Sequence, residues 1–245
     1  MEVGAIDEMA TDPTVAAKGA DLVILCTPVG AFSDILRQIS PVLHPGAIIT
    51  DVGSTKGSVV EAAAKQLPAS VHFVGSHPMA GSEKRGVEFA RADLFKGALC
   101  ILTPTAKTNP STTKQLKEFW QQLGMRLTEM SPEDHDRLVA DISHLPHAVA
   151  AALVAMQSDP ALKLAGRGFL DATRIASGDG GLWRDILLDN RDNIRAGVER
   201  LQQTLASLLE QLDRKDAEGL RQWLDAAAAK RENWARQKLQ ELNPE

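Results

Sequence analysis

The sequence predicts an α/β domain with a doubly wound parallel sheet, followed by an all-α domain. Two observations support this prediction. Short apolar runs alternate with helical patterns through the first half of the chain, which is typical of a parallel sheet covered by helices. From Ser131 onward only helical spacing occurs. We therefore expect one domain over residues 1–130 and a second, helical domain over residues 131–245.

The composition is that of an ordinary soluble globular protein. The chain has 245 residues and a formal net charge of -5 with interspersed signs, which argues against a nucleic-acid partner because such binders need a basic face. No signal peptide and no apolar run near the roughly 20 residues that span a bilayer are present, so no membrane partner is expected. Cys26 and Cys100 both lie in apolar runs and are predicted to be buried free thiols, which indicates a cytoplasmic protein.

The first predicted strand is Asp21–Cys26, a continuous apolar run rich in branched residues. Such runs are typical of central strands that are covered on both faces. The run ends at Thr27-Pro28, and helical spacing follows over 31–39. A second copy of this unit comprises the strand 47–53 and the helix 57–67. The repeated order of strand, turn and helix favours a parallel sheet.

Further elements continue this alternation up to residue 129. The short run Val71–Val74 is predicted to be a buried strand that breaks at Gly75-Ser76. The remaining predicted elements are a helix near 84–91, a strand over 98–102, a helix over 111–123 and a strand over 125–129.

His77 follows the strand Val71–Val74 and directly precedes Pro78. Proline disfavours the helical region for the residue before it, so His77 is expected to be extended on a turn at the strand's end. An imidazole that titrates near neutrality is a candidate general base or acceptor for a substrate hydroxyl. The alternative, favoured for a lone histidine, is a strand-end side chain that bonds to the backbone.

Three turns are predicted at the carboxyl edge of the sheet, where ligands of open α/β sheets bind. They are Thr27-Pro28, Gly53–Lys56 and Ser76–Pro78. In the second turn, free N–H groups at the helix start and the Lys56 ammonium favour an anion or a carbonyl dipole. Simple capping of the helix by Ser54 or Thr55 accounts for the hydroxyls equally well.

The helical half begins with Ser131-Pro132-Glu133-Asp134, a helix-start signature with a cap, a proline and acids in the first turn. The predicted helices cover 138–156, 162–175, 182–209 and 216–242. An apolar stripe fits either a helical dimer interface or an ordinary bundle within one chain. Its members are Val198, Leu201, Leu205, Leu208, Leu209 and Leu212.

His144 and His147 lie on either side of a proline that should kink their helix. Two histidines at this spacing raise the possibility of a metal site. We reject zinc and expect no metal, because no third ligand follows at a recognisable spacing and neither cysteine belongs to a CxxC pair. One histidine is instead a candidate for the site while the other packs.

Arg174 is a candidate for recognition of a carboxylate, because its planar guanidinium can form two parallel hydrogen bonds with one. The alternative is an ion pair with Asp171, three residues earlier, and on spacing alone this is favoured.

Four segments together resemble the prephenate/arogenate (cyclohexadienyl) dehydrogenases of tyrosine biosynthesis. They are His77–Glu83 (HPMAGSE), Ser143–His147 (SHLPH), Gly168–Ala176 and Leu182–Asp185 (LWRD). Their order and spacing fit the family over nearly the whole chain.

The resemblance implies an enzyme with a Rossmann-like domain that oxidises a cyclohexadienol, either prephenate or arogenate, with NAD or NADP as hydride acceptor. The ring carboxylate would leave as carbon dioxide, giving 4-hydroxyphenylpyruvate or tyrosine. By the same resemblance His77 takes the proton of the 4-hydroxyl, and Ser54 lies near that hydroxyl and the nicotinamide.

Other family roles fall on matching positions of this sequence. His147 and Arg174 would line the substrate pocket, with Arg174 on a carboxylate, and Glu83 would lie at its entrance. Thr27 and Pro28 would contact the dinucleotide. The helical half would form a homodimer.

The sequence departs from the family at its beginning. A Rossmann domain opens with a strand and a GxGxxG turn, and roughly the first 30 residues of that fold are not recognisable here. We therefore expect weak or no NAD(P) binding by these 245 residues. A second hypothesis is a non-catalytic dimeric sensor of prephenate or an aromatic amino acid. A third, a hydroxy-acid dehydrogenase with a catalytic lysine, is disfavoured by the HPMAG and SHLPH pair.

Overall fold

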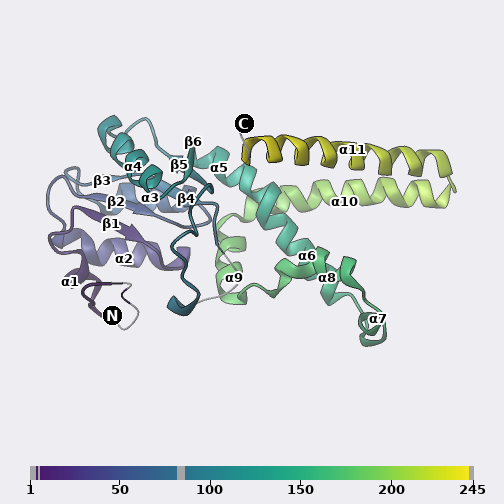
Figure 1. The fold of residues 1–245 in the computed structure, drawn as a ribbon, viewed down its shortest axis with the longest axis horizontal. Coiled ribbons are helices and arrows are strands. Elements are labelled where there is room, and N and C mark those ends of the chain that lie inside the picture. The colour runs from purple at the N-terminus through teal and green to yellow at the C-terminus, as the bar shows by residue number, and fades with distance from the viewer. Residues whose placement is uncertain (1–3, 5, 82–85, 243–245) are drawn as a thin grey trace. The chain divides into compact units, whose positions relative to one another are not determined.

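The computed structural model describes residue 4 and residues 6–81 and 86–242. It forms two compact units, residues 1–194 and 195–245. All strands of the described residues precede Ser131, and the chain beyond it is helical (Figure 1). This confirms the predicted fold class of a mainly parallel α/β sheet followed by helices.

The first sheet consists of β1 (Leu22–Leu25), β2 (Ile48–Asp51) and β3 (His72–Phe73), paired in parallel in that order. Helix α2 (Phe32–Ile39) connects β1 to β2, and α3 (Gly57–Gln66) connects β2 to β3. Parallel neighbours need such crossover connections. The repeated order of strand and helix in the sequence therefore predicted this parallel sheet correctly.

The position of β1 differs from the prediction. We expected a central strand, but among the described residues β1 pairs with β2 alone and lies at the edge of the sheet. Leu22, Val23 and Ile24 are therefore only half-buried, and Cys26 is exposed, contrary to the prediction of a buried thiol. An apolar run shows that a strand has apolar neighbours, but it cannot show how many strands flank it. Cys100 is free and buried, as predicted.

The second sheet consists of β4 (Gly75–Pro78), β5 (Leu99–Thr103) and β6 (Arg126–Glu129). Strands β5 and β6 are parallel and joined by α4 (Pro110–Gln122), whereas β4 and β5 are antiparallel. His77 lies inside β4, opposite Ile101 of β5. The prediction of an extended His77 was correct, but the prediction of a turn was wrong, because pairing with β5 keeps the chain extended past Gly75-Ser76.

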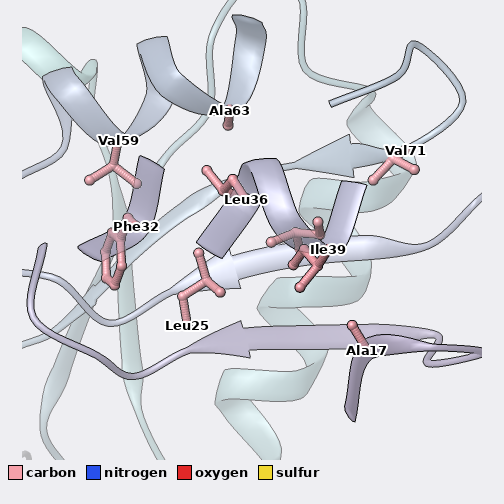
Figure 2. Close-up of a cluster of buried hydrophobic side chains, with 9 residues drawn as sticks. Ala17, Leu25, Phe32, Leu36, Ile39, Val59, Ala63 and Val71 are labelled. Atoms are coloured by element: carbon pink, nitrogen blue, oxygen red, sulfur yellow. The ribbon is translucent and has the colours of Figure 1, made fainter. Parts of the chain in front are cut away.

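Two apolar cores hold these layers together. In the first, α1 (Pro13–Ala17), α2 and α3 pack with β1 and β2 (Figure 2). Its buried members are Ala17, Leu25, Phe32, Leu36, Ile39, Ile49, Val59, Ala63 and Val71. The second core lies between α4 and the β5–β6 pair, and its buried members are Cys100, Leu102, Trp120 and Met125.

The helical half starts as predicted. The side chain of Ser131 accepts a hydrogen bond of 3.0 Å from the backbone N–H of Asp134, at the start of α5 (Pro132–Val139). A π-helical turn, Ala140–His144, leads into α6 (Leu145–Ala155). Pro146 lies at the beginning of α6, directly after the π turn, so the predicted distortion takes the form of this π turn within a continuous helical stretch.

The continuous helical stretch Pro132–Ala155 is long and apolar enough to cross a membrane by length and composition. We expected no such run. The stretch nevertheless carries four buried polar side chains, His135, Asp136, His144 and His147, as expected of a helix that packs within a protein and contributes to a site.

The predicted helix over 162–175 is divided in the structure. Helix α7 (Asp159–Lys163) and helix α8 (Arg167–Thr173) are separated at Gly166, and a 3₁₀ turn, Arg174–Ser177, precedes α9 (Gly180–Asp189). Gly166 has extended backbone angles, which end the helical pattern that the apolar residues suggested. Where we expected a helix near 84–91, the described part contains only a 3₁₀ turn, Val87–Phe89.

Helix α10 (Arg191–Asp213) and helix α11 (Ala217–Leu242) make up the second unit, apart from the first turn of α10 (Figure 1). The turn between them contains Lys215, which has a positive φ of 53°. The predicted helix over 182–209 is interrupted at Asn190, where α9 ends. Several apolar side chains of this unit are exposed, namely Val198, Leu205, Leu209, Leu212, Leu224, Trp234 and Leu239.

Candidate active site

His77 is the centre of a buried cluster of ionisable side chains. Strand β4 places its ring in the interior, and only 8% of the residue is exposed. Burial lowers the pKa of His77 well below its usual value, and the nearby Lys56, His135 and His144 lower it further. The imidazole is therefore neutral at physiological pH and can accept a proton.

Two residues of α5 lie behind His77 in a chain of hydrogen bonds. The Nδ1 atom of His77 is 2.8 Å from Nε2 of His135, and the two rings are tilted by 59°. On the other side of its ring, Nδ1 of His135 is 2.8 Å from Oδ1 of Asp136. His135 is completely buried, and Asp136 nearly so.

The Asp136 carboxylate also caps the N-terminus of α3. It accepts 2.8 Å hydrogen bonds from the backbone N–H groups of Lys56 and Gly57. Burial raises the pKa of Asp136, but the hydrogen bonds from His135, Gly57 and Lys56 outweigh this effect, and the pKa lies below the usual value. We expected these N–H groups to receive a ligand anion, but their anion is a side chain of the protein itself.

Lys56 is likewise engaged within the protein. Its Nζ atom donates to Oδ2 of Asp51 and, at 2.9 Å, to the backbone carbonyl of Ser76, and both charged side chains are completely buried. Asp51 also accepts hydrogen bonds from the backbone N–H groups of Gly53 and Ser76. The expectation that Lys56 offers its ammonium to a ligand is thus wrong, because Asp51 already neutralises it.

His144 and His147 both contribute to the cluster's surroundings. Asn190 donates to Nδ1 of His144 at 3.1 Å and also to the backbone carbonyl of Asp136. Burial lowers the pKa of His144 to about 4, although Asp136 works in the opposite direction. The His147 ring stacks on Trp183 of α9, with centroids 3.4 Å apart and planes 12° apart.

Six buried side-chain polar atoms have no hydrogen-bond partner in the part of the chain that the structure describes. Three of them belong to Thr55, which precedes Lys56, and to the two histidines of this region: Thr55 Oγ1, His144 Nε2 and His147 Nδ1. Buried polar atoms are normally paired, so unpaired ones at a histidine cluster suit a polar ligand. Within the described ranges no three His, Cys, Asp or Glu side chains lie close enough together to hold a metal ion.

The other predicted site residues occupy different environments. Ser54 is half-buried between β2 and α3, and its backbone raises the pKa of His144 against the larger effect of burial. Thr27 and Pro28 are exposed directly after β1, and Arg174 is exposed at the start of a 3₁₀ turn. Glu83 lies outside the described residues.

The sequence reasoning missed His135, Asp136 and the stacking of Trp183. A signal for the first two was present. Pro132, His135 and Val139 recur at helical spacing and are all buried, so a histidine occupied a core position of a helix whose start was already recognised. The sequence contained no comparable signal for Asp136, whose partners Lys56 and Gly57 are distant along the chain.

Known proteins resemble this chain along nearly its whole length. The family profile described as "Prephenate dehydrogenase, nucleotide-binding domain" matches residues 1–129, and "Prephenate dehydrogenase, dimerization domain" matches residues 131–226. A prephenate dehydrogenase of Bacillus subtilis is 40% identical over 93% of the chain, which spans 63% of that relative's length. A cyclohexadienyl dehydrogenase of Zymomonas mobilis is 36% identical over 82% of the chain and 73% of its own length.

A solved structure extends this similarity to the fold. The crystal structure of prephenate dehydrogenase from A. aeolicus, in complex with hydroxyphenyl propionate and NAD+, has a TM-score of 0.88 and 39% identity. The match covers 95% of this chain and 83% of that one. It confirms the Rossmann-like sheet with a helical C-terminal half that the sequence predicts. Together the profiles, the relatives and the fold show that the chain belongs to the prephenate dehydrogenase family.

Proposed function

We propose that this chain carries the catalytic centre of a prephenate or arogenate dehydrogenase. The observation that carries the proposal is His77, an imidazole kept neutral by burial and held at the end of a hydrogen-bond chain. A neutral imidazole suits the removal of the 4-hydroxyl proton of a cyclohexadienol. Hydride leaves C4, the ring carboxylate departs as carbon dioxide, and its bonding electrons complete the aromatic ring.

The cofactor is proposed to be NAD or NADP, which supplies the hydride acceptor of the reaction. Ser54 and the exposed Thr27 and Pro28 follow β2 and β1, at the edge of a parallel sheet where dinucleotides bind. Thr55, His144 and His147 each carry a buried polar atom without a hydrogen-bond partner among the described residues, which supports a polar ligand in this region. The relative from A. aeolicus was solved with NAD+, which supports a nicotinamide cofactor without choosing between its two forms.

The substrate side of the site is assigned by family position. His147 is proposed to line the substrate pocket, and its stacking on Trp183, which holds the ring in one orientation, supports this role. Arg174 is proposed to bind a carboxylate of the substrate, and Glu83 to lie at the entrance. The product is 4-hydroxyphenylpyruvate from prephenate or tyrosine from arogenate.

The helical half is proposed to form a homodimer. Exposed apolar side chains on α10 and α11, among them Leu205, Leu209 and Trp234, support a partner more than a self-contained bundle. Light scattering at the mass of one chain would contradict the dimer.

The domain division and the location are proposed as well. Residues 1–130 form the dinucleotide domain, and residues 131–245 form the substrate and dimerisation domain. Free thiols at Cys26 and Cys100 support a cytoplasmic location.

Absorbance at 340 nm tests the proposed reaction. Prephenate and arogenate are each assayed with NAD and with NADP, on this chain and on a version fused to a strand and GxGxxG turn, because that segment of a Rossmann domain is not recognisable in these 245 residues. We expect turnover that falls by about 10²–10⁴ in His77→Asn, the range typical of a lost general base. His72→Asn, a half-buried histidine of β3, is the matched control and should keep its activity. Prephenate binding without turnover in any form would instead support a sensor.

A further inference from the structure

His77 is one end of a buried relay that continues through His135 to Asp136. The two links measure 2.8 Å each, and none of the three residues is more than 8% exposed. We infer that His135 and Asp136 are positioning residues, which fix the Nδ1–H tautomer of His77 and leave the lone pair on Nε2 for the substrate hydroxyl. The inference rests on the proposed function and adds two residues to it.

The direction of the relay follows from its last member. An ionised carboxylate only accepts hydrogen bonds, so Nδ1 of His135 must be the donor to Asp136. An imidazole whose single ring proton is on Nδ1 has its lone pair on Nε2, and Nε2 is the His135 atom that faces His77. Nδ1 of His77 therefore carries the ring proton and donates a hydrogen bond to Nε2 of His135. Which nitrogen of a histidine is protonated is set by the hydrogen bond that the other atom makes, and here the bond is buried.

Asp136 is itself held firmly enough to set this direction. Both of its carboxylate oxygens accept backbone N–H groups at the start of α3, from Lys56 and Gly57. Its backbone carbonyl accepts from Asn190, which also binds His144. Rotation of the carboxylate would break hydrogen bonds to the α3 backbone, so the acceptor offered to His135 has one fixed orientation.

A purely structural role is the competing explanation, because Asp136 also caps α3. The two explanations differ in what happens to the tautomer of His77. A structural role allows either tautomer in the folded protein, whereas the relay requires Nδ1–H. They also differ in kinetics, since loss of the relay lowers kcat while substrate contacts, and hence KM, are kept.

The first measurement needs no turnover. Two-bond ¹H–¹⁵N correlation spectra of histidine-labelled protein distinguish a protonated Nδ1 from a protonated Nε2, and His77→Asn assigns the signal among the six histidines. We expect Nδ1–H for His77 in the unaltered protein. If His77 is instead the Nε2–H tautomer at neutral pH, the relay is overturned, whatever reaction the protein catalyses.

The second measurement uses matched variants. In His135→Leu we expect kcat to fall about 10²-fold or more, by analogy with the roughly 10⁴-fold loss when a triad aspartate that sets a histidine tautomer is replaced, with KM within about threefold. His135→Gln keeps an acceptor oxygen for His77 and should recover at least about tenfold of that loss. His72→Leu is the control for removing a histidine outside the cluster.

Equal kcat values in His135→Leu and His72→Leu would overturn the relay, as would equal values in the Leu and Gln variants. If His135→Leu does not fold, the tautomer in the unaltered protein and the Gln variant decide the question. Absence of turnover in the unaltered protein would reject the proposed function alone, because the tautomer is measured independently of it.

Discussion

At the scale of single residues, the surroundings decide the chemistry more than the residue type does. Lysine is normally an exposed cation, yet Lys56 is completely buried against Asp51. Histidine normally titrates near neutrality, yet burial and the nearby Lys56 ammonium lower the pKa of His77 well below its usual value and keep the ring neutral. The two facts are connected, because the Lys56 ammonium is one of the charges that disfavour a second positive charge on His77.

The Lys56–Asp51 pair gives a prediction at this scale. Lys56→Met should destabilise the protein by about 3–5 kcal/mol, because it leaves the Asp51 carboxylate buried without its counter-charge. Urea unfolding followed by tryptophan fluorescence measures the loss. The double variant Lys56→Met with Asp51→Asn removes both charges and should recover part of the stability. A loss below about 1 kcal/mol in the single variant would contradict the pair's role, given the usual cost of breaking a buried pair.

At the scale of elements, the site depends on contacts between segments that the chain pattern treats as separate. Helix α5 contacts β4 through the hydrogen bond between His135 and His77. It contacts the start of α3 through the hydrogen bond that Asp136 accepts from the backbone N–H of Lys56. Helix α6 reaches α9 through the stacking of His147 on Trp183. Gly178, just before α9, lies against both rings of that stack.

Gly178 gives the prediction at this scale. An added Cβ would lie 2.4 Å from Trp183 Nε1 and 2.9 Å from His147 Cε1, while its φ of -62° suits any residue. Gly178→Ala should therefore cost about 1–3 kcal/mol through overpacking and shift the tryptophan emission. The proposed pocket would be disturbed as well, so we expect a raised KM. Gly168→Ala is the matched control, because nothing lies within 4 Å of its added Cβ. Equal unfolding midpoints for the two variants would refute the expectation.

At the scale of the whole molecule, stability should fall in mild acid. The folded protein holds His144 neutral with a pKa of about 4, while the usual value is 6.5. Between these values the unfolded chain binds the proton and the folded chain does not, so the unfolding free energy decreases as the pH falls below 6.5. At about 1.4 kcal/mol per pKa unit, His144 accounts for roughly 3 kcal/mol, and the lowered pKa of His77 adds to this effect.

Chemical unfolding at a series of pH values checks this expectation. The unfolding free energy should be nearly constant above pH 7 and fall steadily towards pH 4. In His144→Gln the slope should be shallower, because one of the titrating groups is gone. A wild-type profile that is flat between pH 7 and pH 4 would show that the buried histidines do not control acid stability.

The sequence was sufficient for the elements and for several site residues. The βαβ alternation, the start of α5 at Pro132 and the extended His77 all follow from local preferences and periodicity, which act over a few residues. The four family motifs added the reaction and the roles proposed for Ser54, His147 and Arg174.

Only the tertiary structure decided which of these residues act together. Three features depend on pairings between segments: β1 has one neighbour among the described strands, β5 runs antiparallel to β4, and Lys56 neutralises Asp51. The same holds for the relay behind His77, whose nearest link joins residues 58 positions apart. Local propensity carries no information about such contacts, because burial and hydrogen bonding between distant segments arise only when the whole chain packs.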